Sequence, residues 1–136
     1  MNEVSPETRT VTVEREFPHP PEKLWRALTQ PHLIEEWLMK SDFKPIAGHA
    51  FRFTADWGGV DCKVEAVEPN KTLSYTWDAF GLESVVTWTL TPTSTGTRLR
   101  MEQMGFKPDQ EQAYQGAQYA WPGYFTAMEK VLSRID

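Results

Sequence analysis

The sequence has few residues of several kinds, and each shortage excludes a class of protein. Cys62 is the only cysteine among the 136 residues, so no internal disulfide is possible. The fourteen Lys and Arg residues are scattered along the chain, and the formal net charge is -5. Because nucleic acids are bound through basic patches, we expect no nucleic-acid partner.

Long apolar segments are also missing. No run approaches the roughly 20 residues that a membrane-spanning helix needs. Residues 1–16 are polar and acidic and contain no apolar core of a signal peptide. These features predict a cytoplasmic protein without a membrane span. The chain has neither an internal repeat nor a linker, and its length predicts a single domain over residues 1–136.

Patterns typical of metal binding and catalysis are scarce as well. The histidines are His19, His32 and His49, and none has a second ligand at i,i+4 spacing. Cys62 has no CxxC partner, and no serine stands in a GxSxG context. We therefore predict no metal, no cofactor and no catalytic residue, and we favour a role other than catalysis.

The order of hydrophobic patterns predicts the secondary structure. Residues 9–17, RTVTVEREF, alternate between apolar and polar side chains, as in a half-buried strand. Two short helices should then begin at Pro21 and Pro31, since proline suits the first helical position. Five further strands are separated by turn sequences, at residues 49–56, 60–67, 72–78, 83–92 and 97–104. Their short connections favour an antiparallel meander.

The last predicted element is a long helix that should begin near Asp109, with Gln112 completing a capping box. Its apolar stripe keeps one helical phase through Pro122 and Gly123, so we expect one helix with a kink near residues 118–121. A proline in a helix interior costs roughly 3 kcal/mol, and a glycine about 1 kcal/mol. The two breakers either shape the helix beside a cavity or only bend it to follow the curvature of the sheet.

These elements predict an α+β fold. A sheet with one apolar face must bury that face against another element, and the C-terminal helix is the only large candidate. We expect a curved, six-stranded antiparallel sheet around the long helix, with two short helices between the first and second strands. The space between sheet and helix would form a cavity.

The order of these residues resembles the SRPBCC superfamily (START-like and Bet v 1-like helix-grip proteins), in particular the branch named for the activator of Hsp90 ATPase (AHSA1-like). The similarity covers nearly the whole chain. The residues on which the similarity rests are Arg15, Phe17, Pro20, Trp25, Pro31, Leu33, Trp37, Gly48, Phe51, Phe53 and the segments 58–78, 87–106 and around Trp121. It implies the helix-grip fold. Many relatives have a histidine where this chain has Gln103, and a Gly-Trp pair where Trp121 is followed by Pro-Gly.

The resemblance and the seventeen aromatic side chains favour binding of a small hydrophobic or aromatic ligand, lipid- or polyketide-like, with a role in the stress response. The alternative is that the same side chains fill a solid core. The predicted lining residues are Trp57, Tyr75, Trp77, Trp88, Met101, Gln103, Tyr114, Trp121 and Phe125.

Two other functions stay open. One is an Hsp90-related co-chaperone or protein-interaction module, with an Hsp90-type chaperone as partner. Eukaryotic relatives carry an additional N-terminal domain, which we do not expect here because only residues 1–8 precede the first predicted strand. The other is a small cyclase or hydrolase that uses the same pocket.

Arg15 lies on the otherwise apolar face of the first predicted strand. We expect it to pair with a carboxylate such as Glu36, Glu65 or Glu102.

Overall fold

A computed structural model of the protein describes residues 8–136. Residues 1–7, which belong to the polar N-terminal segment discussed above, lie outside the described residues. The elements, in chain order, are β1 (Arg9–Phe17), α1 (Pro21–Thr29), α2 (Pro31–Trp37), β2 (Lys40–Ser41), β3 (Ala50–Ala55), β4 (Gly58–Glu68), β5 (Thr72–Ala79), β6 (Leu82–Pro92), β7 (Thr97–Phe106) and α3 (Glu111–Arg134).

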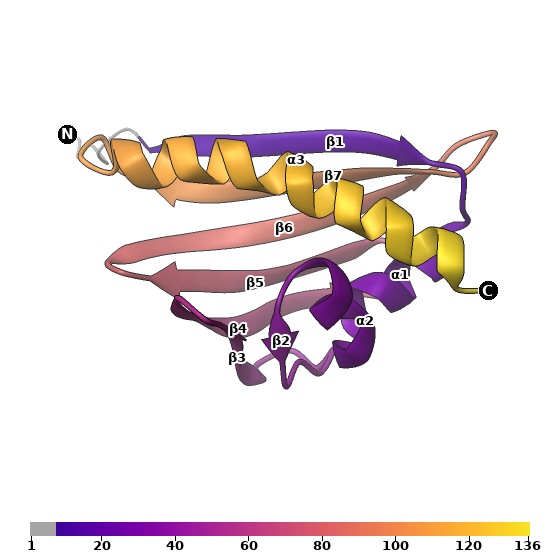
Figure 1. The fold of residues 1–136 in the computed structure, drawn as a ribbon, viewed down its shortest axis with the longest axis horizontal. Helices are drawn as coiled ribbons and strands as arrows, with labels where there is room; N and C mark the ends of the chain where they lie inside the picture. The colour runs from indigo at the N-terminus through magenta and orange to yellow at the C-terminus, as the bar shows by residue number, and fades with distance from the viewer. Residues whose placement is uncertain (1–7) are drawn as a thin grey trace.

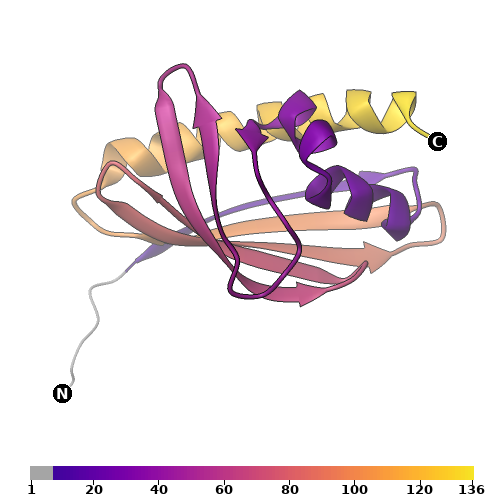
Figure 2. The ribbon, with the colours of Figure 1, turned by 90° about the horizontal axis from the view of Figure 1, so that it is seen from below.

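The strands form one antiparallel sheet in the order β1-β7-β6-β5-β4-β3-β2. Helix α3 crosses one face of this sheet, and α1 and α2 pack beside its C-terminal half (Figure 1). Figure 2 shows that the sheet is curved, with the β3–β4 hairpin rising on the side where α3 lies. The apolar face of the sheet is therefore covered by three helices.

The predicted α+β fold with a long C-terminal helix and a curved antiparallel sheet is confirmed, but the predicted number of strands is wrong. Among the described residues the sheet has seven strands instead of six. The additional strand is β2, which pairs Lys40 with Thr54 and Ser41 with Phe53. Two residues are too few to show an alternating pattern, so this pairing depends on tertiary contacts that place the segment after α2 against β3.

Both short helices begin at the predicted prolines, which lack the N–H group that a first helical residue would leave unpaired. The buried face of α1 carries Leu24, Ala27 and Leu28. Helix α2 is anchored by Trp37, whose indole N–H donates to the Ala27 carbonyl at 2.8 Å. No helix within residues 8–136 has the length and apolar character needed to cross a membrane.

Helix α3 begins later than the sequence predicts. Asp109 lies in the turn before the helix, and the residue preceding the first helical position is Gln110. The Gln110 side chain instead accepts from the Lys107 backbone N–H at 3.0 Å and donates to the Gly81 carbonyl at 3.2 Å. The predicted capping box is therefore wrong, because the residue at the cap position is Gln110 and not Asp109. The Gln110 side chain links the loop to the β5–β6 turn.

Helix α3 continues without interruption through Pro122 and changes direction near its middle (Figure 1). From Trp121 onward the helix is buried through Trp121, Phe125, Met128, Val131 and Leu132. Pro122 and Gly123 lie on the solvent-exposed side. The breakers are therefore outside the packed face of the helix.

Arg15 pairs with a different carboxylate from those predicted. Its guanidinium lies 3.5 Å from Glu129 of α3 and donates to the Thr126 hydroxyl at 3.2 Å and the Pro122 carbonyl at 3.4 Å. The predicted partners lie elsewhere: Glu36 pairs with Arg134, Glu102 pairs with Arg100, and Glu65 is exposed on β4. Because the inward face of β1 packs against α3, the helix supplies the partner of Arg15.

We expect the double substitution Pro122→Ala and Gly123→Ala to stabilise the fold by on the order of 1 to 3 kcal/mol. Alanine at position 122 restores a backbone donor, and a Cβ at position 123 would meet no atom within 4 Å. Denaturant unfolding followed by circular dichroism measures the change. A destabilised double variant would instead show that the bend is needed to hold Trp121 and Phe125 in the core.

Candidate ligand-binding pocket

A pocket of about 570 Å³ lies between the sheet and the N-terminal half of α3. Aromatic and aliphatic side chains dominate its lining. Those from the sheet and its turns are Trp57, Val60, Trp77, Ala79, Phe80, Leu82, Gln103 and Phe106. Those from the helix include Ala113, Gly116, Ala117, Ala120, Trp121 and Tyr124. The volume is within the range of small-molecule sites in proteins.

The pocket exists because the two halves of α3 carry side chains of different size. The first half presents Ala113, Gly116, Ala117 and Ala120 to the pocket. The second half fills the equivalent space with large side chains such as Phe125 and those that follow it. The small residues leave the space between the sheet and the first half of the helix unfilled, so the cavity is confined to that end of the helix.

A hydrogen-bonded network lies at the inner end of the pocket. The Trp121 indole Nε1–H donates to Gln103 Oε1 at 2.8 Å, and Gln103 Nε2–H donates to Ser84 Oγ at 3.0 Å. The Ser84 hydroxyl in turn donates to the Trp77 carbonyl at 2.7 Å. Gln103 and Trp121 are each only 2% exposed. The network therefore fixes the orientation of a buried amide that lines the cavity.

Two exposed aromatic side chains stand at the mouth of the pocket. Trp57 lies in the two-residue turn between β3 and β4, and Phe80 in the turn between β5 and β6. Their ring centroids are 5.9 Å apart, although the residues are 54% and 82% exposed. The two hairpin tips thus place an apolar contact where the pocket meets solvent.

Phe80 also has an unusual backbone conformation. It has φ +50°, and Gly81 after it has φ +84°, as a two-residue hairpin turn of type I′ requires. Asn, Asp or Gly normally occupies the first of these positions, because a left-handed conformation is unfavourable for a bulky side chain by about 1 to 2 kcal/mol. Phenylalanine adds nothing to the turn itself, so this residue is a candidate for a functional role at the mouth.

Two titratable groups at the pocket, Glu111 and Tyr124, have pKa values shifted away from neutral pH. Hydrogen bonds from Gln115 and Arg9 lower the pKa of Glu111, which therefore stays ionised. Desolvation raises the pKa of the half-buried Tyr124, which stays protonated. Within residues 8–136, no three His, Cys, Asp or Glu side chains gather as a metal site.

One known protein family matches most of this chain. The sequence model of the family "Activator of Hsp90 ATPase homolog 1-like protein" matches residues 18–133. The chain is an AHSA1-like protein. The resemblance inferred from the sequence is thus confirmed. No curated protein matches the chain.

Solved structures share the fold of this AHSA1-like protein. Protein MLL2253 from Mesorhizobium loti is 66% identical, with a TM-score of 0.92 over 94% of this chain and 99% of that one. DynU16, from the dynemicin biosynthetic locus, is 24% identical, with a TM-score of 0.83 over 92% of this chain and 47% of that one. CalU16 from Micromonospora echinospora is 20% identical, with a TM-score of 0.81 over 93% of this chain and 78% of that one. The last two comparisons concern the fold alone.

The AHSA1-like structure divides the predicted lining residues into two groups. Trp57, Trp77, Gln103 and Trp121 line the pocket. The other five lie outside its lining, and four of these belong to the buried core: Tyr75, Trp88, Met101 and Phe125. The fifth, Tyr114, packs against Phe106 and lies beneath the Arg9 guanidinium. Whether the four pocket residues bind a ligand stays a prediction.

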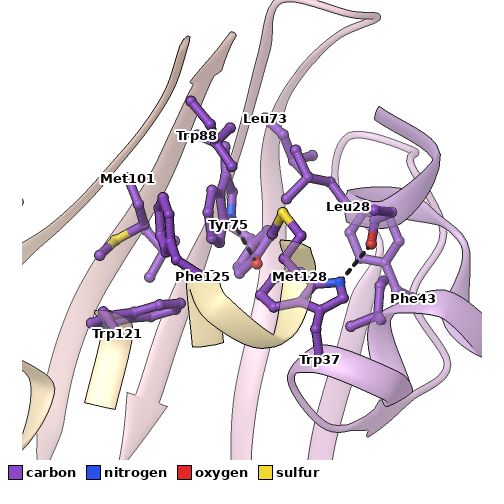
Figure 3. Close-up of a cluster of buried hydrophobic side chains, with 14 of the residues drawn as sticks. Leu28, Trp37, Phe43, Leu73, Tyr75, Trp88, Met101, Trp121, Phe125 and Met128 are labelled. Atoms are coloured by element: carbon purple, nitrogen blue, oxygen red, sulfur yellow. Dashed lines mark hydrogen bonds between the residues drawn. The ribbon is translucent and has the colours of Figure 1, made fainter. Parts of the chain in front are cut away.

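Figure 3 shows Tyr75, Trp88, Met101, Trp121 and Phe125 within one cluster of buried side chains. The Trp88 ring contacts both Trp121 and Phe125, with centroids 5.7 Å and 5.8 Å away. Its indole N–H donates to the Tyr75 hydroxyl at 3.0 Å. The ring centroids of Trp121 and Trp77 are 5.3 Å apart, and both residues line the pocket. The Trp121 ring therefore forms the boundary between the solid core and the cavity.

Several residues that line the pocket were not predicted from the sequence. Phe80 stands in a turn, Tyr124 lies beside the helix breakers, and Ala117 and Ala120 are small. The AFGL turn offered one sign, since a Phe before Gly at a hairpin tip is poor turn chemistry. The run of alanine and glycine in the first half of the long helix offered another. The first is unfavourable for the turn, and the second leaves one helix face without the large side chains that a solid core would need.

Proposed function

We propose that the protein binds a small hydrophobic or aromatic molecule, lipid- or polyketide-like, in the pocket between the sheet and α3. The observation that carries the proposal is a cavity with aromatic walls and a buried, oriented amide at its inner end. Predominantly apolar lining with a few fixed polar groups is typical of small-molecule sites. A cytoplasmic location and a role in the stress response are further predictions.

The alternatives receive less support from the side chains at the pocket. An interaction module would favour a broad exposed apolar patch, whereas the adjacent exposed rings Trp57 and Phe80 line the pocket mouth. A cyclase or hydrolase with acid–base chemistry would favour a group that exchanges protons near neutral pH. Glu111 and Tyr124 have pKa values shifted away from that range.

A matched pair of substitutions in one helix tests the proposal. Gly116 and Gly123 both lie in α3, and a Cβ at either position would meet no atom within 4 Å. Gly116 lines the pocket and Gly123 does not. Leucine at position 116 should fill space that a ligand needs, whereas leucine at position 123 should extend into solvent.

We expect Gly116→Leu to weaken binding of a neutral naphthalene probe by about tenfold or more, because the isobutyl group takes part of its volume. Gly123→Leu should bind as the parent does. Quenching of tryptophan fluorescence measures both, since Trp57, Trp77 and Trp121 line the pocket. Equal binding by the two variants would place the site elsewhere, and no saturable binding by the parent protein to any hydrophobic probe would overturn the proposed function.

A further inference from the structure

The polar groups around the pocket restrict the chemical class of its ligand. We propose that the pocket takes an uncharged planar aromatic molecule with a carbonyl or hydroxyl group, and that the Gln103 amide anchors this group. The inference rests on the proposed function and goes beyond it by specifying charge and polar anchor. It is carried by the charges of the lining and by the unused hydrogen-bonding capacity of Gln103.

The lining offers no counter-ion for an anion. Within residues 8–136, its only charged side chains are Asp109 and Glu111, and both are acidic. The nearby Arg9 is already paired with Glu111, and its guanidinium lies 3.8 Å from the Tyr114 ring centroid. A carboxylate that entered the pocket would lose hydration and gain no cation, because both charged residues of the lining are acidic. Fatty acids and other anionic lipids are therefore disfavoured.

A buried positive charge is also poorly accommodated. Asp109 and Glu111 lie in the loop before α3 and in its first turn, where both are exposed to solvent. Glu111 is further occupied by Arg9 and Gln115. The inner end is formed by neutral groups, so a cation there would lose hydration without a buried carboxylate as its partner. The interior consequently favours an uncharged ligand.

Gln103 lines the pocket and retains hydrogen-bonding capacity beyond the network. An amide carries two N–H donors and two acceptor sites on its oxygen. The indole of Trp121 can only donate, so it fixes which amide atom is the oxygen. One N–H is used by Ser84, which leaves one N–H and one oxygen lone pair. Because buried polar groups are normally satisfied, a ligand group is a natural partner for the unused N–H.

The walls next to this amide favour a flat molecule. Trp77 and Trp121 lie beside Gln103, and Tyr124 packs on Trp121 with a centroid separation of 5.4 Å. Aromatic rings of this kind stack on planar ligands in offset or edge-to-face arrangements. A ketone on such a ligand would accept from Gln103 Nε2–H, and a hydroxyl can also donate to Oε1.

Three naphthalene probes of nearly equal size test the charge and the anchor. They are 2-acetylnaphthalene, which carries a neutral carbonyl, 2-ethylnaphthalene, which is a hydrocarbon, and 2-naphthoate, which is an anion. We expect 2-acetylnaphthalene to bind most tightly near neutral pH, about tenfold more tightly than 2-ethylnaphthalene. We expect 2-naphthoate to bind at least about tenfold more weakly than 2-acetylnaphthalene. Titration by tryptophan fluorescence and calorimetry gives the three dissociation constants.

A substitution at the anchor separates its contribution from that of the apolar walls. Gln103→Leu should remove the preference for 2-acetylnaphthalene over 2-ethylnaphthalene while the hydrocarbon still binds. Gln118→Leu is the matched control, because Gln118 is exposed on α3 and does not line the pocket. That variant should keep the preference. If Gln103→Leu fails to fold, the probe series on the parent protein still decides the question.

The outcomes distinguish this inference from the proposed function. Binding of 2-naphthoate as tight as that of 2-acetylnaphthalene would overturn the exclusion of anions. Equal binding of 2-acetylnaphthalene and 2-ethylnaphthalene, or an unchanged preference in Gln103→Leu, would overturn the anchoring role of Gln103. In each of these cases the pocket still binds ligand. Failure of all three probes would overturn the inference, whereas the proposed function would be overturned only if the parent protein bound no hydrophobic probe at all.

Discussion

Truncation of the chain after Gln118 should abolish the native fold. The deletion removes the buried side chains of the second half of α3, which are Trp121, Phe125, Met128, Val131 and Leu132. Burial of one large apolar side chain contributes about 1.5 to 3 kcal/mol. The total loss, on the order of 10 kcal/mol, is comparable to the whole stability of a typical domain, about 5 to 15 kcal/mol.

The product should be aggregated or molten, with exposed apolar surface and no fixed tertiary packing. Near-ultraviolet circular dichroism and size-exclusion chromatography distinguish these states from a native monomer. The matched control is truncation after Arg134, which removes only the half-buried Ile135 and the exposed Asp136. We expect that control to unfold cooperatively. A cooperative, monomeric transition in the shorter chain would contradict the role assigned to α3.

Gly96→Ala should destabilise the protein by about 3 kcal/mol. Gly96 lies in the β6–β7 turn, where the chain passes directly over the end of β1. A Cβ at this position would lie 2.0 Å from the Phe17 carbonyl oxygen and 2.8 Å from the His19 backbone nitrogen. Both neighbours are backbone atoms, so the clash cannot be relieved by a change of rotamer.

The same substitution at Gly116 is the matched control and should have the opposite sign. A Cβ there would meet no atom within 4 Å, and alanine in a helix interior is more stable than glycine by about 1 kcal/mol. Urea unfolding of both variants gives the two free energies. If Gly96→Ala stayed within about 0.5 kcal/mol of the parent, the turn would have to move freely relative to β1.

The elements of this fold were predictable where one local property decides the structure. Proline at the first helical position located α1 and α2, and alternation located β1 and the five long strands that follow. Two local predictions failed, and for different reasons. Gln110 binds Lys107 and Gly81, which displaced the expected cap at Asp109. Strand β2 is too short to leave any periodic pattern.

The location of the pocket was harder to predict, and the reason is geometric. Alternation indicates which strand side chains point toward the helix, and by that criterion Trp77 and Trp88 are equivalent. Only the path of α3 over the sheet distinguishes them. Trp88 lies beneath Phe125, with the ring centroids 5.8 Å apart, whereas Trp77 borders the cavity left by the small residues of the first half. No pattern within one strand records which part of a distant helix will cover it.

The position of β1 in the sheet also determines the order in which the chain can fold. Its partner is β7, with Arg9 opposite Phe106 and Phe17 opposite Thr97. The hairpins from β3 to β7 close over short loops, but β1 must wait for β7, the last of these strands in the chain, which places a slow, non-local step late in folding. Until then the strand is unpaired and open to wrong partners. Its alternating charges, Glu14, Arg15 and Glu16, are the kind that discourage strands from aggregating during such a delay.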